Sequence, residues 1–167
     1  MKNKAIFFDR DGVLNKNLHY ISSFDNFYWL KNAKKAIKLA YNNKFILIVI
    51  TNQSGIARGY FTANAVKKIH KLMNRDLKKT GCKIHDFYFC PYHPQGIIKR
   101  YSKNSNLRKP NIGMISKAAK KWNIDIKKSF MIGDQKTDRD AAKKANINFF
   151  FKKNKSLLKI IKKICDT

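Results

Sequence analysis

Short apolar runs alternate with longer amphipathic segments along the whole chain. This alternation is typical of a parallel β-sheet whose two faces are covered by helices. Five apolar runs are candidate strands, and they cover residues 4–8, 45–50, 84–89, 129–132 and 147–151. We therefore expect an α/β fold, with a parallel sheet of about five strands and helices on both faces.

Apolar residues at helical spacing mark the segments between these runs. After Thr62, a candidate N-cap, Val66, Ile69 and Met73 recur at intervals of three or four residues, and Gly81 is a natural stop. The same spacing predicts four further helices at residues 32–43, 113–122, 138–145 and 155–165. Helices therefore connect successive strands, as a parallel sheet requires.

The length of 167 residues fits one domain, 1–167, because independent domains usually contain about 100 to 200 residues. No repeat or linker divides the chain. Its three cysteines form neither a secreted disulfide framework nor a paired zinc motif, which favours a reducing compartment. The N-terminus lacks the pattern of a signal peptide, and no apolar run is long enough to span a membrane. We expect a soluble cytoplasmic monomer without a membrane partner.

The charge is strongly positive, since 37 basic residues face 10 acidic ones and give a net charge of +27. Such a surplus often indicates nucleic-acid binding. Only 6 of the basic residues are Arg, however, and the chain has 31 Lys, 17 Asn, 20 Ile and no Glu. These abundant residues share A- and T-rich codons, so a biased genome explains the charge without a ligand. We therefore predict no specific nucleic-acid partner; steering of an anionic metabolite is a further reading.

Against this basic background the few carboxylates cluster. Five of the ten aspartates fall in two short stretches, at positions 9 and 11 and at positions 134, 138 and 140. Both stretches follow predicted strands, and ligands of parallel sheets bind at the carboxyl ends of strands. Two long connections, residues 9–31 and 90–111, are candidates for the walls of a site. Asp138 and Asp140 favour the first turn of a helix, with support of a metal site as the alternative.

Three converging carboxylates suit Mg²⁺, which prefers oxygen ligands and substrate phosphates. Asp9 and Asp11 leave one strand end and Asp134 another, so all three can face one site. A carboxylate that attacks a phosphate dianion needs positive charge nearby, and Lys109 is the best candidate for it. The Thr51 hydroxyl can hold phosphoryl oxygens. One aspartate would be the nucleophile and the other a general acid and base.

Four motifs occur in the order typical of one phosphatase superfamily: FFDRDGVL at 7–14, TNQSG at 51–55, RKP at 108–110 and GD at 133–134. In these motifs the chain resembles haloacid-dehalogenase-type (HAD) phosphatases. Segments 51–59 and 90–96 are similar to the branch that contains heptose-bisphosphate and histidinol-phosphate phosphatases. The resemblance covers residues 4 to 150. It implies a Rossmann-like HAD fold, and no insertion large enough for a cap domain is visible.

The resemblance implies a role for each matching residue. Asp9 would become an aspartyl phosphate, and Asp11 would be the acid and base. Mg²⁺ would be held by the carboxylates of Asp9 and Asp134 and by the backbone carbonyl of Asp11. Thr51 and Lys109 would stabilise the transferring phosphoryl group. The substrate-contacting positions would be Asn17, His19, Tyr20, Asn52, Gln53, Ser54 and Arg108.

The chain departs from the branch at its zinc site. Cys90 remains, but Tyr92, Ser105 and Leu107 stand where the other three ligands would be. One ligand cannot make a tetrahedral site, so we predict no zinc. Gln135 also replaces a Lys that contacts substrate in the heptose enzymes, which bears on recognition of a second phosphate.

The function that the resemblance implies is Mg²⁺-dependent removal of the 7-phosphate from D-glycero-D-manno-heptose 1,7-bisphosphate, a small sugar precursor of lipopolysaccharide. Two enzymatic alternatives share the motifs, histidinol-phosphate phosphatase and polynucleotide 3′-phosphatase. A basic nucleic-acid-binding module is the alternative without catalysis, and it has no use for converging aspartates.

Overall fold

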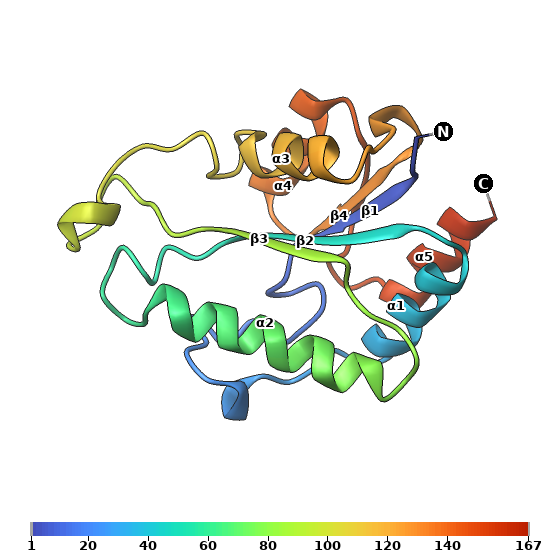
Figure 1. Ribbon diagram of the computed structural model, residues 1–167, viewed down its shortest axis with the longest axis horizontal. Coiled ribbons are helices and arrows are strands. Elements are labelled where there is room, and N and C mark those ends of the chain that lie inside the picture. Colours follow the sequence, from blue (N-terminus) through green and yellow to red (C-terminus); the bar gives the residue numbers. More distant parts are fainter. Residues whose placement is uncertain (1, 167) are drawn as a thin grey trace.

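The computed structural model describes residues 2–166, and a five-stranded sheet forms its centre (Figure 1). The strands are β1 (Ala5–Phe8), β2 (Ile46–Asn52), β3 (Asp86–Cys90), β4 (Phe130–Gly133) and β5 (Asn148–Phe151). All neighbouring strands run parallel, in the order β3-β2-β1-β4-β5. The predicted α/β architecture is confirmed.

Helices cover both faces of the sheet, as Figure 1 shows. They are α1 (Ala33–Asn42), α2 (Ala63–Lys78), α3 (Gly113–Lys121), α4 (Lys136–Ala145) and α5 (Leu157–Cys165). Alternate residues of β1 point to opposite faces: Ile6 and Phe8 pack with α1, α2 and α5, whereas Ala5 and Phe7 pack with α3 and α4. All four are fully buried, so β1 is the centre of two hydrophobic layers. Within residues 2–166, no helix combines the length and apolar character needed to cross a membrane.

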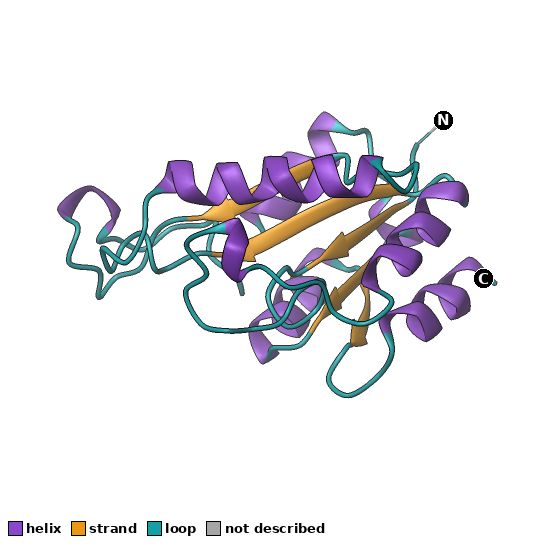
Figure 2. Ribbon diagram, turned by 90° about the horizontal axis from the view of Figure 1, so that it is seen from below, coloured by secondary structure: helices purple, strands orange, loops and turns teal. Residues whose placement is uncertain are grey.

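The strand order creates a crevice beside β1. The chain passes from β1 to β2 and β3 in one direction and then returns to place β4 on the other side of β1. Connections therefore leave β1 and β4 towards opposite faces, and ligands of open parallel sheets bind at such a point. Figure 2 shows the long loops gathered beyond the arrowheads of the strands, at this carboxyl edge.

Several boundaries differ from the predicted ones. β2 includes Thr51 and Asn52, which pair in register with β3, although their polar side chains end the apolar run. α4 begins two residues before Asp138. Three single-turn 3₁₀ helices within residues 2–166 were not predicted, because so short a turn has no hydrophobic period. They are η1 (Phe24–Asn26), η2 (Lys99–Tyr101) and η3 (Ile126–Lys128).

The ends of α2 follow the predicted signals. The backbone N–H of Ala65 donates to the Thr62 hydroxyl over 3.1 Å, which caps the first turn. The helix ends at Lys78, and Gly81 then adopts a φ of +72°, a conformation that glycine takes without a steric cost.

Candidate active site

A cleft of about 260 Å³ opens at the carboxyl edge of the sheet. Its walls come from the loop after β1, the end of β2, the segment before α3 and the start of α4. The lining residues are Asp9, Asp11, Asn17, His19, Tyr20, Thr51, Asn52, Gln53, Ser54, Gly55, Lys109, Asp134, Gln135, Thr137 and Asp138. Every site residue predicted from the sequence except Arg108 is therefore in one cleft.

Three carboxylates converge on the floor of this cleft. Asp9, Asp134 and Asp138 each offer an oxygen, and these oxygens lie within 4.8 Å of one another. The ammonium of Lys109 donates to Asp9 Oδ1 over 2.8 Å and lies 2.6 Å from Asp138 Oδ1. Lys109 is itself almost fully buried, so this contact is shielded from solvent. Three acids facing one lysine leave two negative charges without a partner, which suits one divalent cation.

Two glycines allow the carboxylates to approach the backbone. A Cβ at Gly12, where φ is +84°, would collide with the carboxylate of Asp134. A Cβ at Gly133 would collide with the side chain of Asp138. The glycines of the first and fourth motifs therefore make room for the acids that face the cleft.

The acids compete for the same small volume, and this alters their ionisation. Burial raises the pKa of Asp9 to about 7; Lys109 acts in the opposite direction, while Asp138 and Asp11 add to the rise. Burial also raises the pKa of Asp134. For Lys109, burial lowers the pKa, but the Asp9 and Asp138 carboxylates outweigh it and the pKa is raised. The lysine therefore stays charged, and a cation near Asp9 and Asp134 would favour their ionised forms.

Asp11 lies in the same cleft but has different neighbours. Its carboxylate accepts hydrogen bonds from Asn15 Nδ2 and Gln53 Nε2, each 2.9 Å long. Arg10 adds a salt bridge of 3.0 Å. The Asp11 side chain is 24% exposed, so one edge remains open to the cleft. It is not one of the three converging acids, and its backbone carbonyl is the group that the resemblance assigns to Mg²⁺.

The end of β2 holds several of these groups in place. The side-chain amide of Asn52 donates to the carbonyl of Lys109 over 3.1 Å and accepts from its N–H over 3.0 Å. Gln53 Nε2 donates to both Asp11 and the Thr51 hydroxyl. We predicted both amides as substrate contacts. They line the cleft, but their hydrogen bonds within the protein also position Lys109 and Asp11.

The rim of the cleft carries an exposed aromatic pair. Tyr20 and Tyr60 are 47% and 59% exposed, and their rings meet edge to face with centroids 4.6 Å apart. His19 and Tyr20 both have positive φ angles, 49° and 52°, which are uncommon for residues other than glycine. Such strain is typical of functional loops. The loop predicted to contact substrate is therefore held in a constrained conformation beside the cleft.

Arg108 is the one predicted site residue outside the cleft. It lines a neighbouring hollow with His93 and Ser105, and Nη1 donates to the carbonyl of Tyr92 over 3.4 Å. The pKa of Arg108 is lowered, first by burial and then by the charge of Arg58. The sequence places Arg108 beside Lys109, but the chain turns here, with the N–H of Arg108 donating to the carbonyl of Ser105 and the N–H of Asn111 to the carbonyl of Arg108, and of the two residues only Lys109 lines the cleft.

Four positions correspond to the zinc ligands of the branch that this chain resembles. They are Cys90, at the end of β3, and Tyr92, Ser105 and Leu107 in the segment that follows. Cys90 is fully buried and donates weakly to the carbonyl of Tyr92 over 3.8 Å, and burial raises the pKa of its thiol. The zinc-free state stays a prediction. Metal analysis of the purified protein should find less than about one-tenth of an equivalent of zinc, because three of the four ligand positions are changed.

Asp138 has a larger part in the site than its sequence position indicated. Its Oδ2 accepts from the backbone N–H of Gln135 over 3.0 Å, which caps α4 as expected. Its other oxygen contacts Lys109, so the residue is both a cap and a counter-charge. The signal available in the sequence was its spacing of four residues from Asp134 at the start of a helix, which places both near one helix end.

A parallel sheet with this switch point, a carboxylate cluster and a buried lysine defines a phosphatase site of the HAD type. The family model described as polynucleotide kinase 3 phosphatase matches residues 4–161. The chain belongs to this family of HAD-type phosphatases, and it is a phosphoric monoester hydrolase.

Individual relatives carry more specific names. A D-glycero-beta-D-manno-heptose-1,7-bisphosphate 7-phosphatase of Rhodopseudomonas palustris is 40% identical over 149 residues, 89% of this chain and 83% of that protein. An enzyme of Photorhabdus laumondii named for the alpha anomer is 39% identical over 146 residues, 87% of this chain and 80% of the relative. The D,D-heptose 1,7-bisphosphate phosphatase of B. bronchiseptica, solved with magnesium and phosphate, has a TM-score of 0.87 and 25% identity and covers 98% of both chains.

Proposed function

We propose that this protein removes the 7-phosphate from D-glycero-D-manno-heptose 1,7-bisphosphate in the cytoplasm, in a Mg²⁺-dependent reaction that supplies a precursor of lipopolysaccharide. The observation that carries the proposal is the buried contact of Lys109 with Asp9 and Asp138 on the floor of the cleft. It places a cation beside the one carboxylate at which a phosphoryl group can be received.

The first half of the reaction uses Asp9 and Asp11. Lys109 donates to Oδ1 of Asp9 and keeps a positive charge beside the carboxylate that attacks phosphorus. A bond forms between Asp9 and phosphorus, and the bond from phosphorus to the sugar oxygen breaks. Asp11 gives a proton to the departing oxygen from its open side in the cleft. The product is an aspartyl phosphate and a free alcohol.

The second half reverses the roles of the same groups. A water molecule gives a proton to Asp11 and attacks phosphorus, and the bond between phosphorus and Asp9 breaks. Inorganic phosphate leaves and both aspartates return to their starting forms. Lys109 and the Thr51 hydroxyl face the phosphoryl oxygens in both steps, which stabilises the charge that develops there.

The donor set fits Mg²⁺. Oδ1 of Asp134 is buried and has no hydrogen-bond partner among the described residues, and Asp134 offers a ligand oxygen within 4.8 Å of those of Asp9 and Asp138. An unpaired buried carboxylate oxygen is costly unless a cation meets it. Asp9 and Asp134, with the Asp11 backbone carbonyl, would hold the ion. When bound, Mg²⁺ supplies positive charge that offsets the repulsion between the attacking carboxylate and the phosphate.

The identity of the sugar rests on the relatives. Their names include both anomers of the heptose bisphosphate at nearly equal identity, so both are candidate substrates. A cleft of about 260 Å³ admits the phosphate and part of a sugar, and the rim residues His19 and Tyr20 would meet the remainder. Gln135 stands at the cleft and donates to Asp134 Oδ2 over 3.1 Å, so here it supports a metal ligand instead of offering a cation to the second phosphate.

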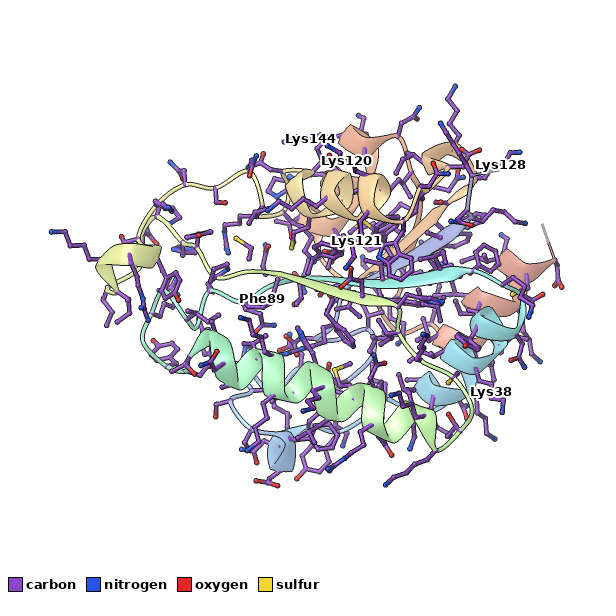
Figure 3. The ribbon with its side chains drawn as sticks, viewed as in Figure 1. Lys38, Phe89, Lys120, Lys121, Lys128 and Lys144 are labelled. Atoms are coloured by element: carbon purple, nitrogen blue, oxygen red, sulfur yellow. The ribbon has the colours of Figure 1, made fainter. Side chains whose placement is uncertain are left out.

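A polynucleotide 3′-phosphatase is the second candidate, because the matching family model is named for that activity and the charge is +27. The placement of the lysines argues for the sugar. Lys38 on α1 and Lys144 on α4 are exposed and lie on opposite faces of the sheet, so the lysines are not confined to one face (Figure 3). A nucleic-acid surface would collect such charges along one face.

Phosphate release from three substrates separates the candidates. The heptose bisphosphate, histidinol phosphate and a 3′-phosphorylated oligonucleotide are compared with Mg²⁺ at roughly 50 and 200 mM salt. We expect the heptose bisphosphate to have the highest kcat/KM, with a small salt effect because the reacting phosphate is shielded in the cleft. Asp9→Asn provides the blank. If phosphate is released faster from the oligonucleotide at the higher salt concentration, the substrate is a polynucleotide and the proposed catalytic residues stay the same.

A further inference from the structure

Arg10 lies between the two aspartates of the first motif, and it is completely buried. It is the largest side chain in the described residues with no exposed surface. A guanidinium is always charged and is expensive to remove from water unless it is paired. The way in which the protein pairs this cation is therefore informative.

The partner of Arg10 is the next residue, Asp11. Arg10 Nε donates to Asp11 Oδ1 over 3.2 Å, and Nη2 lies 3.0 Å from both carboxylate oxygens. A two-pronged contact of this kind fixes the plane of a carboxylate as well as its position. Asn15 and Gln53 add one bond to each oxygen. The Asp11 carboxylate is thus held from behind, with its free edge towards the cleft.

The opposite side of the guanidinium meets α2. Arg10 Nη1 lies 3.5 Å from Nε2 of His70. Arginine can only donate, so Nε2 of His70 must be the acceptor and its ring proton must be on Nδ1. The His70 ring is buried and stacks on Phe87 with centroids 4.5 Å apart. Burial and then the charge of Arg10 lower the pKa of His70 well below its ordinary value, which keeps the ring neutral.

From these contacts we infer that Arg10, supported by His70, is a positioning residue that orients Asp11 for proton transfer to and from the reacting oxygens. The inference rests on the proposed role of Asp11 as acid and base. It assigns no direct substrate contact to Arg10, which is sealed beneath the cleft. The Asp9, Asp134 and Asp138 cluster does not depend on Arg10.

Comparing two leaving groups distinguishes a positioning role of Arg10 from a purely structural one. An alkyl phosphate releases an alkoxide that needs a proton, whereas p-nitrophenyl phosphate releases a stable phenolate that does not. Arg10→Met keeps much of the side-chain volume and removes the hydrogen bonds. In single turnovers, with release of the alcohol or phenol followed by rapid quench, we expect the rate of the first half-reaction to fall about 10- to 100-fold for the alkyl ester and to stay within about 3-fold of wild type for the aryl ester. Hydrolysis of the aspartyl phosphate, which the two esters share, should slow to the same extent for both.

Asp11→Asn tests whether Arg10 acts through Asp11. The single change should reproduce the selective loss on the alkyl ester. Adding Arg10→Met to it should lower the rate by no more than about 2-fold, since coupled residues are not additive. Equal losses on both esters in the first half-reaction, or a full extra loss in the double variant, would overturn the inference.

A matched control is present on the surface. Arg139 pairs with its following residue Asp140 through the same two atoms, Nε and Nη2, each 3.1 Å from Oδ1, but both side chains are partly exposed. Arg139→Met should change neither ester. His70→Phe keeps the stacked ring and removes the acceptor, so it should produce a loss of about 3-fold confined to the alkyl ester.

Two controls cover a variant that does not fold and a wild type that does not act on the heptose bisphosphate. Thermal unfolding shows whether each variant folds; if Arg10→Met does not, Arg10→Lys retains a buried cation without the two-pronged contact and should show the same ester selectivity. If wild type releases no phosphate from the heptose bisphosphate, the substrate proposal fails. The comparison of esters then uses glycerol phosphate, and the inference about Arg10 is judged separately.

Discussion

Asp9 and Asp11 are two residues apart and line the same cleft, yet their surroundings are opposite in kind. Asp9 is buried among other acids, with one lysine as its counter-charge. Asp11 is surrounded by donors from Arg10, Asn15 and Gln53. A crowded acid is a strong nucleophile once a cation relieves the repulsion, whereas a carboxylate held by donors keeps a fixed orientation. The difference teaches that environment, and not residue type, would divide the two proposed roles of nucleophile and acid–base.

The largest effect should come from removing the nucleophile. Asp9→Asn is expected to lower turnover at least about 1,000-fold, because an amide cannot form the covalent intermediate. Rapid-quench labelling with a phosphorylated substrate should show no protein-bound phosphate. Circular dichroism provides the folding control. Substantial turnover by the folded variant would break the distinction between the two aspartates.

The second-largest effect should come from Asp138, which is a counter-charge of Lys109 in the acidic cluster around Asp9. Asp138→Asn can still accept from the backbone of Gln135, so α4 should keep its cap while Lys109 loses one of its two carboxylates. We expect kcat to fall about 100-fold. The control is Asp140→Asn, at a partly exposed acid in the same helix, which should stay within about 2-fold. Equal rates in both variants would show that Asp138 is only a cap.

A smaller loss of activity is expected when one of the hydrogen-bond donors to Asp11 is removed. Gln53→Leu removes the bonds to Asp11 Oδ2 and to the Thr51 hydroxyl and preserves the size of the side chain. Because Arg10 and Asn15 remain, kcat for an alkyl phosphate should fall only about 10-fold. Gln95→Leu, at an exposed glutamine, is the control and should have wild-type kinetics. A loss as large as that of Asp9→Asn would contradict this view of Asp11.

The smallest effect is on stability and follows from the raised pKa of Asp9. Without metal, the folded protein retains the Asp9 proton between its usual pKa of 3.8 and about 7, where the unfolded chain releases it. The stabilisation is therefore complete below the lower value and is lost as pH rises through the upper one. In urea unfolding with a chelator, wild type should lose roughly 1 to 3 kcal/mol between pH 5 and 8 relative to Asp9→Asn. A relative gain would reverse the sign of the argument.

The sequence predicted the sheet and most of the cleft for one physical reason. Apolar runs report strands that are buried on both sides, and parallel strands bring their carboxyl ends to one edge, so Asp9 and Asp134 had to approach each other. The need for a positive charge and a hydroxyl beside a phosphate indicated Lys109 and Thr51, and the motif resemblance implied the same two residues. The sequence around Arg10 does not indicate, however, that the Arg10 side chain points into the interior while the Asp11 side chain points to the cleft.

Contacts between segments that are far apart in the chain could not be predicted from the sequence either. The pairing of Asn52 with Lys109 spans 57 residues, and that of Arg10 with His70 spans 60. Both depend on tertiary packing, which propensity and periodicity do not encode. Arg108 illustrates the same limit, since its neighbour Lys109 is on the floor of the cleft while Arg108 itself lines the hollow beside it.

The pairing of Asn52 with Lys109 has a consequence for how this scaffold could be altered. Lys109 is fastened to β2 at its N–H and its carbonyl, and its ammonium also donates to the carbonyl of Ile50 over 3.0 Å. Its coordinates are thus set by the sheet and not by the segment at 91–107 that leads to it. That segment becomes a module: it can be shortened, lengthened or exchanged for a metal-binding graft while the lysine stays anchored. Changes in the length or sequence of this segment can therefore accumulate without displacing the Lys109 ammonium.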